Sequence, residues 1–191
     1  MRKISTLFKR DMNNGGRITK EYSEYLEDFP NGEWTESVAT EKLDGTNVRL
    51  TVRNHQLMRL EKRRNPDKIQ KHNGIEEPWY VDADLVSPQD KWITDALNNT
   101  DLSKVPDGEW SGEAVGPDIQ GNPIGLPRNS IVFFSLGQAP VHENVPTTFD
   151  ELKIWLPKQQ SKFGAGTIEG IVWHWSDGSM AKIKVKDFKQ P

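Results

Sequence analysis

The sequence predicts an α+β fold in which antiparallel strands dominate and short helices lie at the periphery. Two pairs of alternating segments support this prediction. Residues 48–52 and 57–62 flank a polar turn, and residues 168–175 and 180–186 flank the turn Ser-Asp-Gly-Ser. Alternation with period two on both sides of a short turn is typical of a β-hairpin. We therefore expect two hairpins to form the framework of the fold.

The other elements are predicted from local patterns. Residues 1–10 alternate weakly and indicate either a short strand or a packed arm, whereas residues 116–127 are rich in Gly, Pro and Asn and indicate a long loop. Residues 63–90 are polar and contain Pro, so we expect an irregular insertion anchored by Trp79 and Tyr80. Further strands are expected around Val38, over 107–113 and over 131–136, and helices over 20–29, 90–97 and 148–156.

Length and composition indicate a soluble protein. The chain has 191 residues, 34% of them hydrophobic, and seven Trp supply much of the aromatic bulk, so we expect a single domain over 1–191 with a core of large side chains. The absence of Cys excludes disulfides and thiolate chemistry. No apolar run is long enough to span a bilayer, and the N-terminus shows no secretory segment. We expect a monomer that is cytoplasmic or otherwise intracellular and binds no membrane.

The charge is unevenly distributed along the chain. The net charge is −3, yet residues 1–20 hold six Lys or Arg against one Asp, and residues 49–71 hold eight against two acidic residues. Local basic patches, rather than global charge, are the electrostatic feature of phosphate binding. Taken alone, the two patches are more typical of solvated faces.

The segment Thr-Glu-Lys-Leu-Asp-Gly-Thr-Asn, residues 40–47, contains a candidate nucleophile. Lys42 is followed by Asp-Gly and then by a β-rich segment, so it would stand at the edge of a sheet beside a sharp turn at Gly45, which can take backbone angles closed to other residues. A lysine amine has a free pKa of about 10.4 and must be deprotonated to attack phosphorus. Asp-Gly is also a common turn dipeptide, and a lysine beside it is usually a surface charge.

Further charged residues follow on the predicted strands. Arg59 lies on the strand that returns toward Lys42 and could hold a phosphate, a role for which Arg63 and Arg64 compete. Glu113 stands between a strand and the Gly/Pro-rich loop, where a carboxylate can accept ribose hydroxyls or help to hold a metal. Each of these residues, taken singly, is also compatible with a solvated surface position.

The second hairpin carries a carboxylate and three lysines. Glu169 begins an otherwise apolar strand, and a carboxylate is seldom buried unpaired, so it should face a cation or a metal. Lys182, Lys184 and Lys186 alternate along the returning strand and should share one face. Aligned ammonium groups would neutralise a triphosphate, although lysines also protect edge strands from aggregation.

The order of these motifs resembles that of the covalent nucleotidyltransferases, the superfamily of polynucleotide ligases and mRNA capping enzymes. Within it, Gly-Pro-x-Ile-Gln-Gly-Asn-Pro, Glu-Gly-Ile-Val-Trp-His and Lys-Ile-Lys before Asp-Phe are similar to the small ATP-dependent 5′-to-3′ RNA ligases that include the vertebrate enzyme and its phage, viral and bacterial relatives. The resemblance spans residues 3 to 188. It implies an antiparallel adenylation domain, and because the chain ends at Pro191, no OB domain is expected.

The resemblance also implies roles for individual residues. Lys42 would become adenylylated, Asp44 completes its motif, and Lys182 and Lys184 would bind the ATP phosphates, with Lys184 and Lys186 as the alternative pair. Either Phe133 or Phe134 would stack on adenine. The remaining assignments are Glu41, Arg59, Glu113 and Glu169 for nucleotide binding, Asn47, Arg63 and Arg64 for RNA binding, and Glu113 and Glu169 for the metal.

The resemblance therefore implies an ATP-dependent RNA ligase that joins 5′-phosphate and 3′-hydroxyl ends of RNA through a lysyl-AMP intermediate. Its substrates would be ATP and RNA, and Mg²⁺ or Mn²⁺ would be the cofactor. The alternatives are a DNA ligase, a capping-type guanylyltransferase, or a non-catalytic module that binds nucleotide or RNA.

Overall fold

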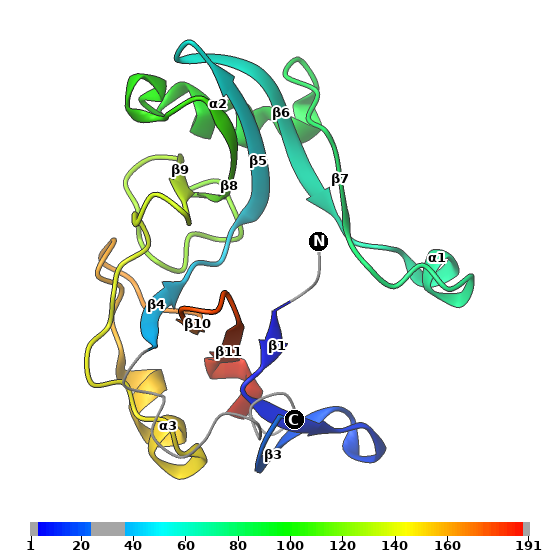
Figure 1. The fold of residues 1–191 in the computed structure, drawn as a ribbon, viewed down its shortest axis with the longest axis vertical. Coiled ribbons are helices and arrows are strands. Elements are labelled where there is room, and N and C mark those ends of the chain that lie inside the picture. Colours follow the sequence, from blue (N-terminus) through cyan, green and yellow to red (C-terminus); the bar gives the residue numbers. More distant parts are fainter. Residues whose placement is uncertain (1–3, 24–36, 189–191) are drawn as a thin grey trace. The chain divides into compact units, whose positions relative to one another are not determined.

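The computed structural model describes residues 4–23 and 37–188 of the chain (Figure 1). The chain forms two compact units. Among the described residues, the first unit contains 44–139, and the second contains 4–23, 37–43 and 140–188. The fold is mixed α+β with mostly antiparallel sheets, as the sequence predicts. No helix of the described residues is long and apolar enough to cross a membrane.

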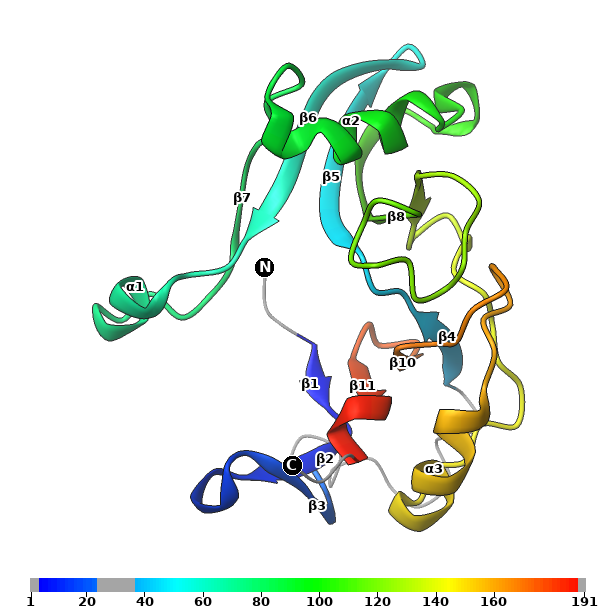
Figure 2. The same cartoon turned by 180° about the vertical axis from the view of Figure 1, so that it is seen from behind.

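The first unit is built on a five-stranded antiparallel sheet. The strand order is β7-β6-β5-β8-β9. Short helices complete the unit, and in both views α1 lies at the far end of the connection between β6 and β7 (Figure 1, Figure 2). The elements are β5 (Thr46–Arg53), β6 (Gln56–Arg64), α1 (Lys68–His72), β7 (Trp79–Asp82), η4 (Pro88–Asp90), α2 (Lys91–Asn98), η5 (Leu102–Lys104), β8 (Gly108–Val115) and β9 (Ser130–Phe133).

Alternation along β5 separates the two faces of this sheet. Val48, Leu50 and Val52 are fully buried and belong to the same apolar cluster as Ile93 and Ala96 of α2. The residues between them therefore point to the opposite face. That polar face is defined by Asn47, Arg49, Glu61, Tyr80, Ser111 and Glu113.

The second unit is built on a four-stranded sheet with the order β1-β11-β10-β4. The strand β1 runs parallel to β11, and the other neighbours are antiparallel. A two-stranded sheet, β2-β3, and the helix α3 accompany it. The elements are β1 (Ser5–Thr6), β2 (Phe8–Asp11), η1 (Met12–Asn14), β3 (Arg17–Tyr22), β4 (Val38–Lys42), α3 (Phe149–Trp155), η6 (Leu156–Lys158), β10 (Gly170–His174), β11 (Met180–Lys184) and η7 (Val185–Phe188).

The four-stranded sheet buries one face and keeps the other polar. Ile171, Trp173 and Ile183 are buried with Leu152 and Leu156 in one apolar cluster. Because side chains alternate, the remaining strand residues point the other way. We call this side the lysine face, and it carries Thr40, Lys42, His174, Lys182 and Lys184.

Most predicted elements are confirmed, including both hairpins and the helices at 90–97 and 148–156. The insertion at 63–90 is more regular than expected, because β7 pairs with β6 and α1 begins with a capping box. The helix expected over 20–29 is wrong for Lys20–Tyr22, which belong to strand β3, the partner of β2. Residues 24–29 lie outside the described part of the chain.

Candidate active site

The strand register of the second unit brings the predicted nucleophile and one predicted phosphate-binding lysine together. Gly170 at the start of β10 is paired with Lys42 of β4 on one side and with Lys184 of β11 on the other. Directly paired residues in antiparallel strands have Cα atoms about 4.5–5.5 Å apart. The two lysines therefore flank the glycine in a single row across three strands.

The carboxylate of Glu169 joins the two lysines. Its Oε2 accepts a hydrogen bond from Lys42 Nζ, and its Oε1 accepts one from Lys184 Nζ at 2.5 Å. Lys42 Nζ also donates to the carbonyl of Leu43 at 3.2 Å. The Glu169 side chain is 10% exposed and the two lysines about 20%. The sequence predicts that Glu169 faces a cation, and in the structure it contacts two, Lys42 and Lys184.

The electrostatics of Glu169 follow from this arrangement. Burial alone would raise the pKa of its carboxyl group, because a charged group loses hydration. The charge of Lys42 and the hydrogen bonds from both ammonium groups outweigh burial and hold the pKa below its ordinary value. Glu169 is therefore an anion that fixes the positions of two cations at neutral pH.

Gly170 is required by the close approach of β10 and β11. A Cβ on this residue would lie 2.0 Å from the carbonyl oxygen of Ile183 and 2.9 Å from the Cα of Lys184. These are backbone atoms, so the two strands would have to separate to admit a side chain. Separation would move Lys184 away from Glu169.

Gly170→Ala is therefore expected to slow the protein adenylylation that the resemblance implies about tenfold and to lower the free energy of unfolding by about 1–3 kcal/mol, the usual cost of overpacking. The measurements are the rate of label uptake from ATP and a urea titration. The matched control is Gly178→Ala, in the exposed turn before β11, where a Cβ meets nothing within 4 Å. That control should lose stability through its backbone angle without a tenfold fall in adenylylation. Equal losses of activity in both variants would contradict the steric argument.

The structure separates the alternative lysine pairs. Lys182 and Lys184 lie on β11 and point to the lysine face. The strand ends at Lys184, and Lys186 is an exposed residue of the 3₁₀ helix η7. The expectation that all three lysines share one strand face is wrong for Lys186, because a change from strand to 3₁₀ geometry breaks the period of two. Of the two alternative pairs, only Lys182 and Lys184 share one face of β11.

The side chain of Glu41 lies away from the lysine face. It is 2% exposed and accepts hydrogen bonds from Ser161 Oγ at 2.6 Å and from the backbone N of Lys162 at 3.0 Å. Its neighbour Lys42 points to the opposite side of β4 because side chains alternate. A contact between nucleotide and the Glu41 carboxylate is therefore not supported. The carboxylate instead ties β4 to the segment that precedes β10.

Gly45 has a different role from the one that the sequence predicts. Gly45 is not among the described residues with a positive φ. A Cβ here would lie 2.1 Å from the carbonyl oxygen of Ala114 and 2.7 Å from Val115 Cγ1. The glycine is thus needed for close contact with β8, and not for a left-handed backbone. Asp44, the residue before it, opens the first unit.

On the first unit, Asn47 and Glu113 form a buried pair. They are cross-strand partners in β5 and β8, and Asn47 Nδ2 donates to Glu113 Oε2 at 3.3 Å. Asn47 is 5% exposed and Glu113 is 9% exposed. The predicted RNA-binding amide and the predicted ribose-binding carboxylate therefore meet at one point of the polar face.

Arg59 does not lie at the end of the hairpin nearest to Lys42 in the sequence, where we expected it. It pairs with Thr51, near the turn of the β5–β6 hairpin and away from Thr46, the end of β5 that follows the nucleophile. Its Nε donates to Asp82 at 2.6 Å, and this carboxylate holds the pKa of Arg59 above its ordinary value. Arg63 lies farther along β6, one residue beyond the Lys62 that pairs with Val48. The register favours Arg63 over Arg59 for a role beside Asn47.

Arg63→Ala is expected to weaken RNA-dependent steps about tenfold or more, the cost of one lost charge-assisted phosphate contact. Arg59→Ala, which removes an arginine with half of its side chain exposed, should change them less than threefold. The measurement is the rate of AMP transfer from the adenylylated protein to 5′-phosphorylated RNA at several salt concentrations. A larger loss of this rate in Arg59→Ala than in Arg63→Ala would contradict the role that the strand register favours for Arg63.

The two candidate stacking residues differ in exposure. Phe133 is fully buried in the apolar cluster beneath the sheet, whereas Phe134 is 38% exposed. Phe133 follows Val132, the partner of Glu113, and therefore points away from the polar face. Phe134 is the one of the two whose ring is accessible to a base.

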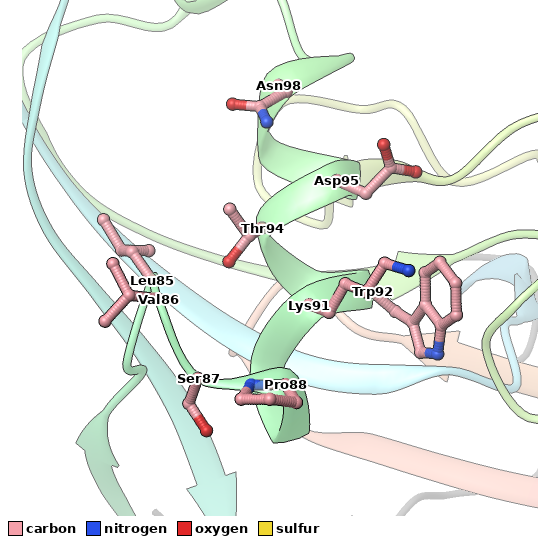
Figure 3. A pocket seen from close by; sticks show the side chains of 9 residues that line it. All are labelled: Leu85, Val86, Ser87, Pro88, Lys91, Trp92, Thr94, Asp95 and Asn98. Atoms are coloured by element: carbon pink, nitrogen blue, oxygen red, sulfur yellow. The ribbon is translucent and has the colours of Figure 1, made fainter.

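A separate pocket lies beside α2. It has a volume of about 420 Å³. Figure 3 shows Trp92 and Lys91 on one side of the helix and Leu85 and Val86 on the other. The predicted site residues are absent from its lining, which consists of Leu85, Val86, Ser87, Pro88, Lys91, Trp92, Thr94, Asp95 and Asn98.

Several residues of the lysine face and of the polar face were not predicted from the sequence. Tyr80 was expected only as an anchor of an insertion, yet its hydroxyl group donates to Asn47 Oδ1 at 2.7 Å. Thr40 and His174 share the lysine face and contact each other at 2.9 Å between Oγ1 and Nε2. Burial lowers the pKa of His174. The alternation of β4 and β10 could have placed Thr40 and His174, whereas the pairing that positions Tyr80 has no local signal.

Comparison with known proteins identifies the family. A sequence model of the RNA ligase 1 family matches residues 94–189, half of the chain. The chain belongs to the RNA ligase 1 family. The matched region contains Glu113, Glu169, Lys182 and Lys184, and the resemblance to RNA ligases that the sequence indicates is confirmed. No curated protein sequence matches the chain.

Solved structures of RNA ligases share the fold of this RNA ligase 1 family member. A lysine mutant of Naegleria gruberi RNA ligase with AMP and Mn has a TM-score of 0.55 at 13% identity, covering 97% of this chain and 60% of that one. An apo aspartate mutant has a TM-score of 0.55 at 14% identity, with 96% and 61% covered. The same ligase with pyrophosphate has a TM-score of 0.51 at 14% identity, with 97% and 60% covered. The chain thus spans about three fifths of these ligases.

Proposed function

We propose that the protein is an ATP-dependent RNA ligase that joins a 5′-phosphate to a 3′-hydroxyl through AMP bound covalently to Lys42. The observation that carries this proposal is the row formed by Lys42, Gly170 and Lys184 with the Glu169 carboxylate across it. It places an amine, a second cation and an anchoring anion within one small group. The family and the motif order support the same chemistry.

The reaction has three steps. The Lys42 ammonium, which Glu169 holds in the resting site, first gives up a proton to solvent. The neutral amine then attacks the α-phosphorus of ATP, an N–P bond forms as the bond to the bridging oxygen breaks, pyrophosphate leaves, and the nitrogen loses its second proton. The 5′-phosphate of RNA then attacks the lysyl-AMP phosphorus, and AMP moves to the RNA as the lysine is released. Finally a 3′-hydroxyl attacks the RNA 5′-phosphorus, a phosphodiester forms, and AMP departs.

The residues of the lysine face would stabilise the negative charges of the reacting phosphates. Lys182 and Lys184 would lie against the phosphates and stabilise the negative charge that pyrophosphate carries away. Glu169 would hold Lys42 and Lys184 in register until ATP enters. On the first unit, we assign Glu113 to the ribose, Asn47 and Arg63 to RNA, and Phe134 to adenine.

Carboxylate oxygens suit the divalent cation that such a reaction requires. Mg²⁺ is usually held by one or two carboxylates together with substrate phosphates. Among the described residues no group of three or more His, Asp or Glu side chains gathers in a metal-binding arrangement. Glu169 fits a site that the phosphates complete, because it offers hard oxygen donors on the lysine face. When bound, the cation would offset charge on the phosphates. Naegleria ligase structures contain Mn with AMP or ATP, which supports a nucleotide and a divalent cation as the ligands of this protein.

The test of this function uses the wild-type protein. Incubation with α-labelled ATP and Mg²⁺ should give protein-bound label that survives denaturation, and a chase with 5′-phosphorylated RNA should move the label to the RNA before the ends are joined. Labelled GTP and 5′-phosphorylated DNA serve as parallel substrates. Labelling by GTP alone would indicate a capping-type enzyme, and faster joining of DNA would indicate a DNA ligase. ATP binding without any adduct would leave a binding module.

A further inference from the structure

The amide of Asn47 is hydrogen-bonded on both of its sides. Its Oδ1 accepts a hydrogen bond from the Tyr80 hydroxyl at 2.7 Å. Its Nδ2 donates to the carbonyl of Gly112 at 3.2 Å and to Glu113 Oε2 at 3.3 Å. An amide flipped by 180° would turn its oxygen toward a carbonyl and a carboxylate. The contacts therefore define one orientation of a side chain that is 5% exposed.

The ring of Tyr80 is itself held in place. The guanidinium carbon of Arg49 lies 4.5 Å from the ring centroid. Arg49 is fixed by Glu61, because Nε donates to Oε2 at 2.6 Å and Nη2 donates to Oε1 at 2.8 Å. The Glu61 carboxylate is 2% exposed, and its hydrogen bonds raise the pKa of Arg49. A bidentate ion pair, here with a buried carboxylate, fixes direction as well as distance.

We infer that Tyr80 is a positioning residue for RNA end recognition: its hydroxyl fixes the amide of Asn47, and through it the carboxylate of Glu113. This inference rests on the proposed function, which assigns Asn47 to RNA. The contacts run from Glu61 on β6 through Arg49 on β5 and Tyr80 on β7 back to Asn47 on β5. Asn47 in turn contacts Glu113 on β8. None of the first three side chains needs to touch the substrate.

The inference gives the pairing of β6 with β7 a defined task. Tyr80 pairs with Arg63 in the register of these two strands. The same short pairing that presents Arg63 therefore also supplies the hydroxyl that orients Asn47. A β-hairpin can transmit such a contact because its two strands move as one hydrogen-bonded unit. The paired ends of β6 and β7 are therefore part of the proposed RNA-binding apparatus.

The first variant removes one oxygen atom. Tyr80→Phe keeps the ring beneath Arg49 but leaves Asn47 Oδ1 without this donor. We expect AMP transfer from the adenylylated protein to 5′-phosphorylated RNA to fall about tenfold, the effect of one lost hydrogen bond to a buried polar group. Adenylylation by ATP should change less than threefold. The matched control is Tyr22→Phe, which removes a half-buried hydroxyl that donates to the carbonyl of Thr147 at 3.0 Å in the second unit.

A double-mutant cycle distinguishes positioning from general destabilisation. If Tyr80 acts through Asn47, Tyr80→Phe should have no further effect on AMP transfer in an Asn47→Ala background. Equal fold-losses in both backgrounds, or an equal loss in Tyr22→Phe, would overturn the inference. Thermal unfolding midpoints of the two Phe variants provide the stability reference.

A second readout does not depend on catalysis. Exchange of the Asn47 side-chain amide protons with solvent, followed by NMR in the wild-type chain and in Tyr80→Phe, should become faster in the variant and stay unchanged in Tyr22→Phe. If the wild type joins no RNA ends, the proposed function fails while this measurement still tests the contact. Unchanged exchange in Tyr80→Phe would overturn the contact itself.

Discussion

Replacing Lys42 by Ala is expected to abolish protein-bound AMP, because the variant lacks the amine that forms the N–P bond. Lys42→Arg should fail equally, since a guanidinium keeps its proton at neutral pH and is no nucleophile. The measurement is intact mass and a denaturing gel after incubation with α-labelled ATP and Mg²⁺. The wild type should gain the mass of one AMP, and both variants should gain none.

The control for this prediction separates the steps of the reaction. Sealing of an RNA strand that already carries AMP on its 5′-phosphate needs no lysine nucleophile, so Lys42→Ala should retain it. Lys153→Ala, at an exposed position of α3, is the matched lysine variant and should label like the wild type. Label that persists in Lys42→Ala would place the nucleophile on another residue and end the assignment.

Glu169→Gln is expected to lower the rate of adenylylation by about 100-fold, because it removes the anion between two ammonium groups while keeping the shape of the side chain. Lys42 and Lys184 would then repel each other in a partly buried site. Breaking such a pair also costs stability, here about 2 kcal/mol after allowance for the partial exposure of the lysines. Single-turnover labelling with ATP and urea denaturation measure the two effects.

The stability effect should depend on pH in a defined direction. The pKa of Glu169 is lower in the folded protein than its ordinary value of 4.5, so folding favours the ionised form. The difference in unfolding free energy between wild type and Glu169→Gln is therefore fully present above pH 4.5 and disappears as the pH falls below it, through the lowered pKa. A difference that persists unchanged into acid would show that packing, rather than charge, is lost.

The matched control for Glu169→Gln is Glu143→Gln, at an exposed position outside the strands. It makes the same chemical change without touching a lysine of the site. Its adenylylation rate and its unfolding free energy should equal those of the wild type at every pH tested. Comparable losses in the two variants would remove the argument that the bridge between Lys42 and Lys184 matters.

Local patterns in the sequence predicted the part of the fold that contains the lysine face. Period-two alternation identified the strands that carry Lys182 and Lys184, and a lone carboxylate at the start of an apolar strand indicated that Glu169 meets a cation. The burial of Glu41 follows from the same alternation, since neighbours on a strand point to opposite sides. Assigning the whole Glu-Lys motif to nucleotide binding overlooked this signal.

Long-range pairing explains what could not be predicted. The position of Arg59 depends on a register shift between Thr51 and Val52, and no local pattern announces it. The contact between Tyr80 and Asn47 requires β7 to pair with β6 after a connection that also forms α1. Such pairings depend on the whole sheet, so the polar residues of 63–90 gave no indication of strand or partner.

The packed side of the four-stranded sheet has a consequence for engineering. Ile171 and Ile183 pair with each other across β10 and β11, one residue away from the row that holds Gly170 and Lys184. Their apolar contacts, and not the charges, select which residues stand opposite one another. A slip of one residue would send Lys184 into the interior and an isoleucine to the solvent. Screens for altered activity should therefore treat these core positions as determinants of catalytic alignment, and loop-length changes beside them as the surest way to lose it.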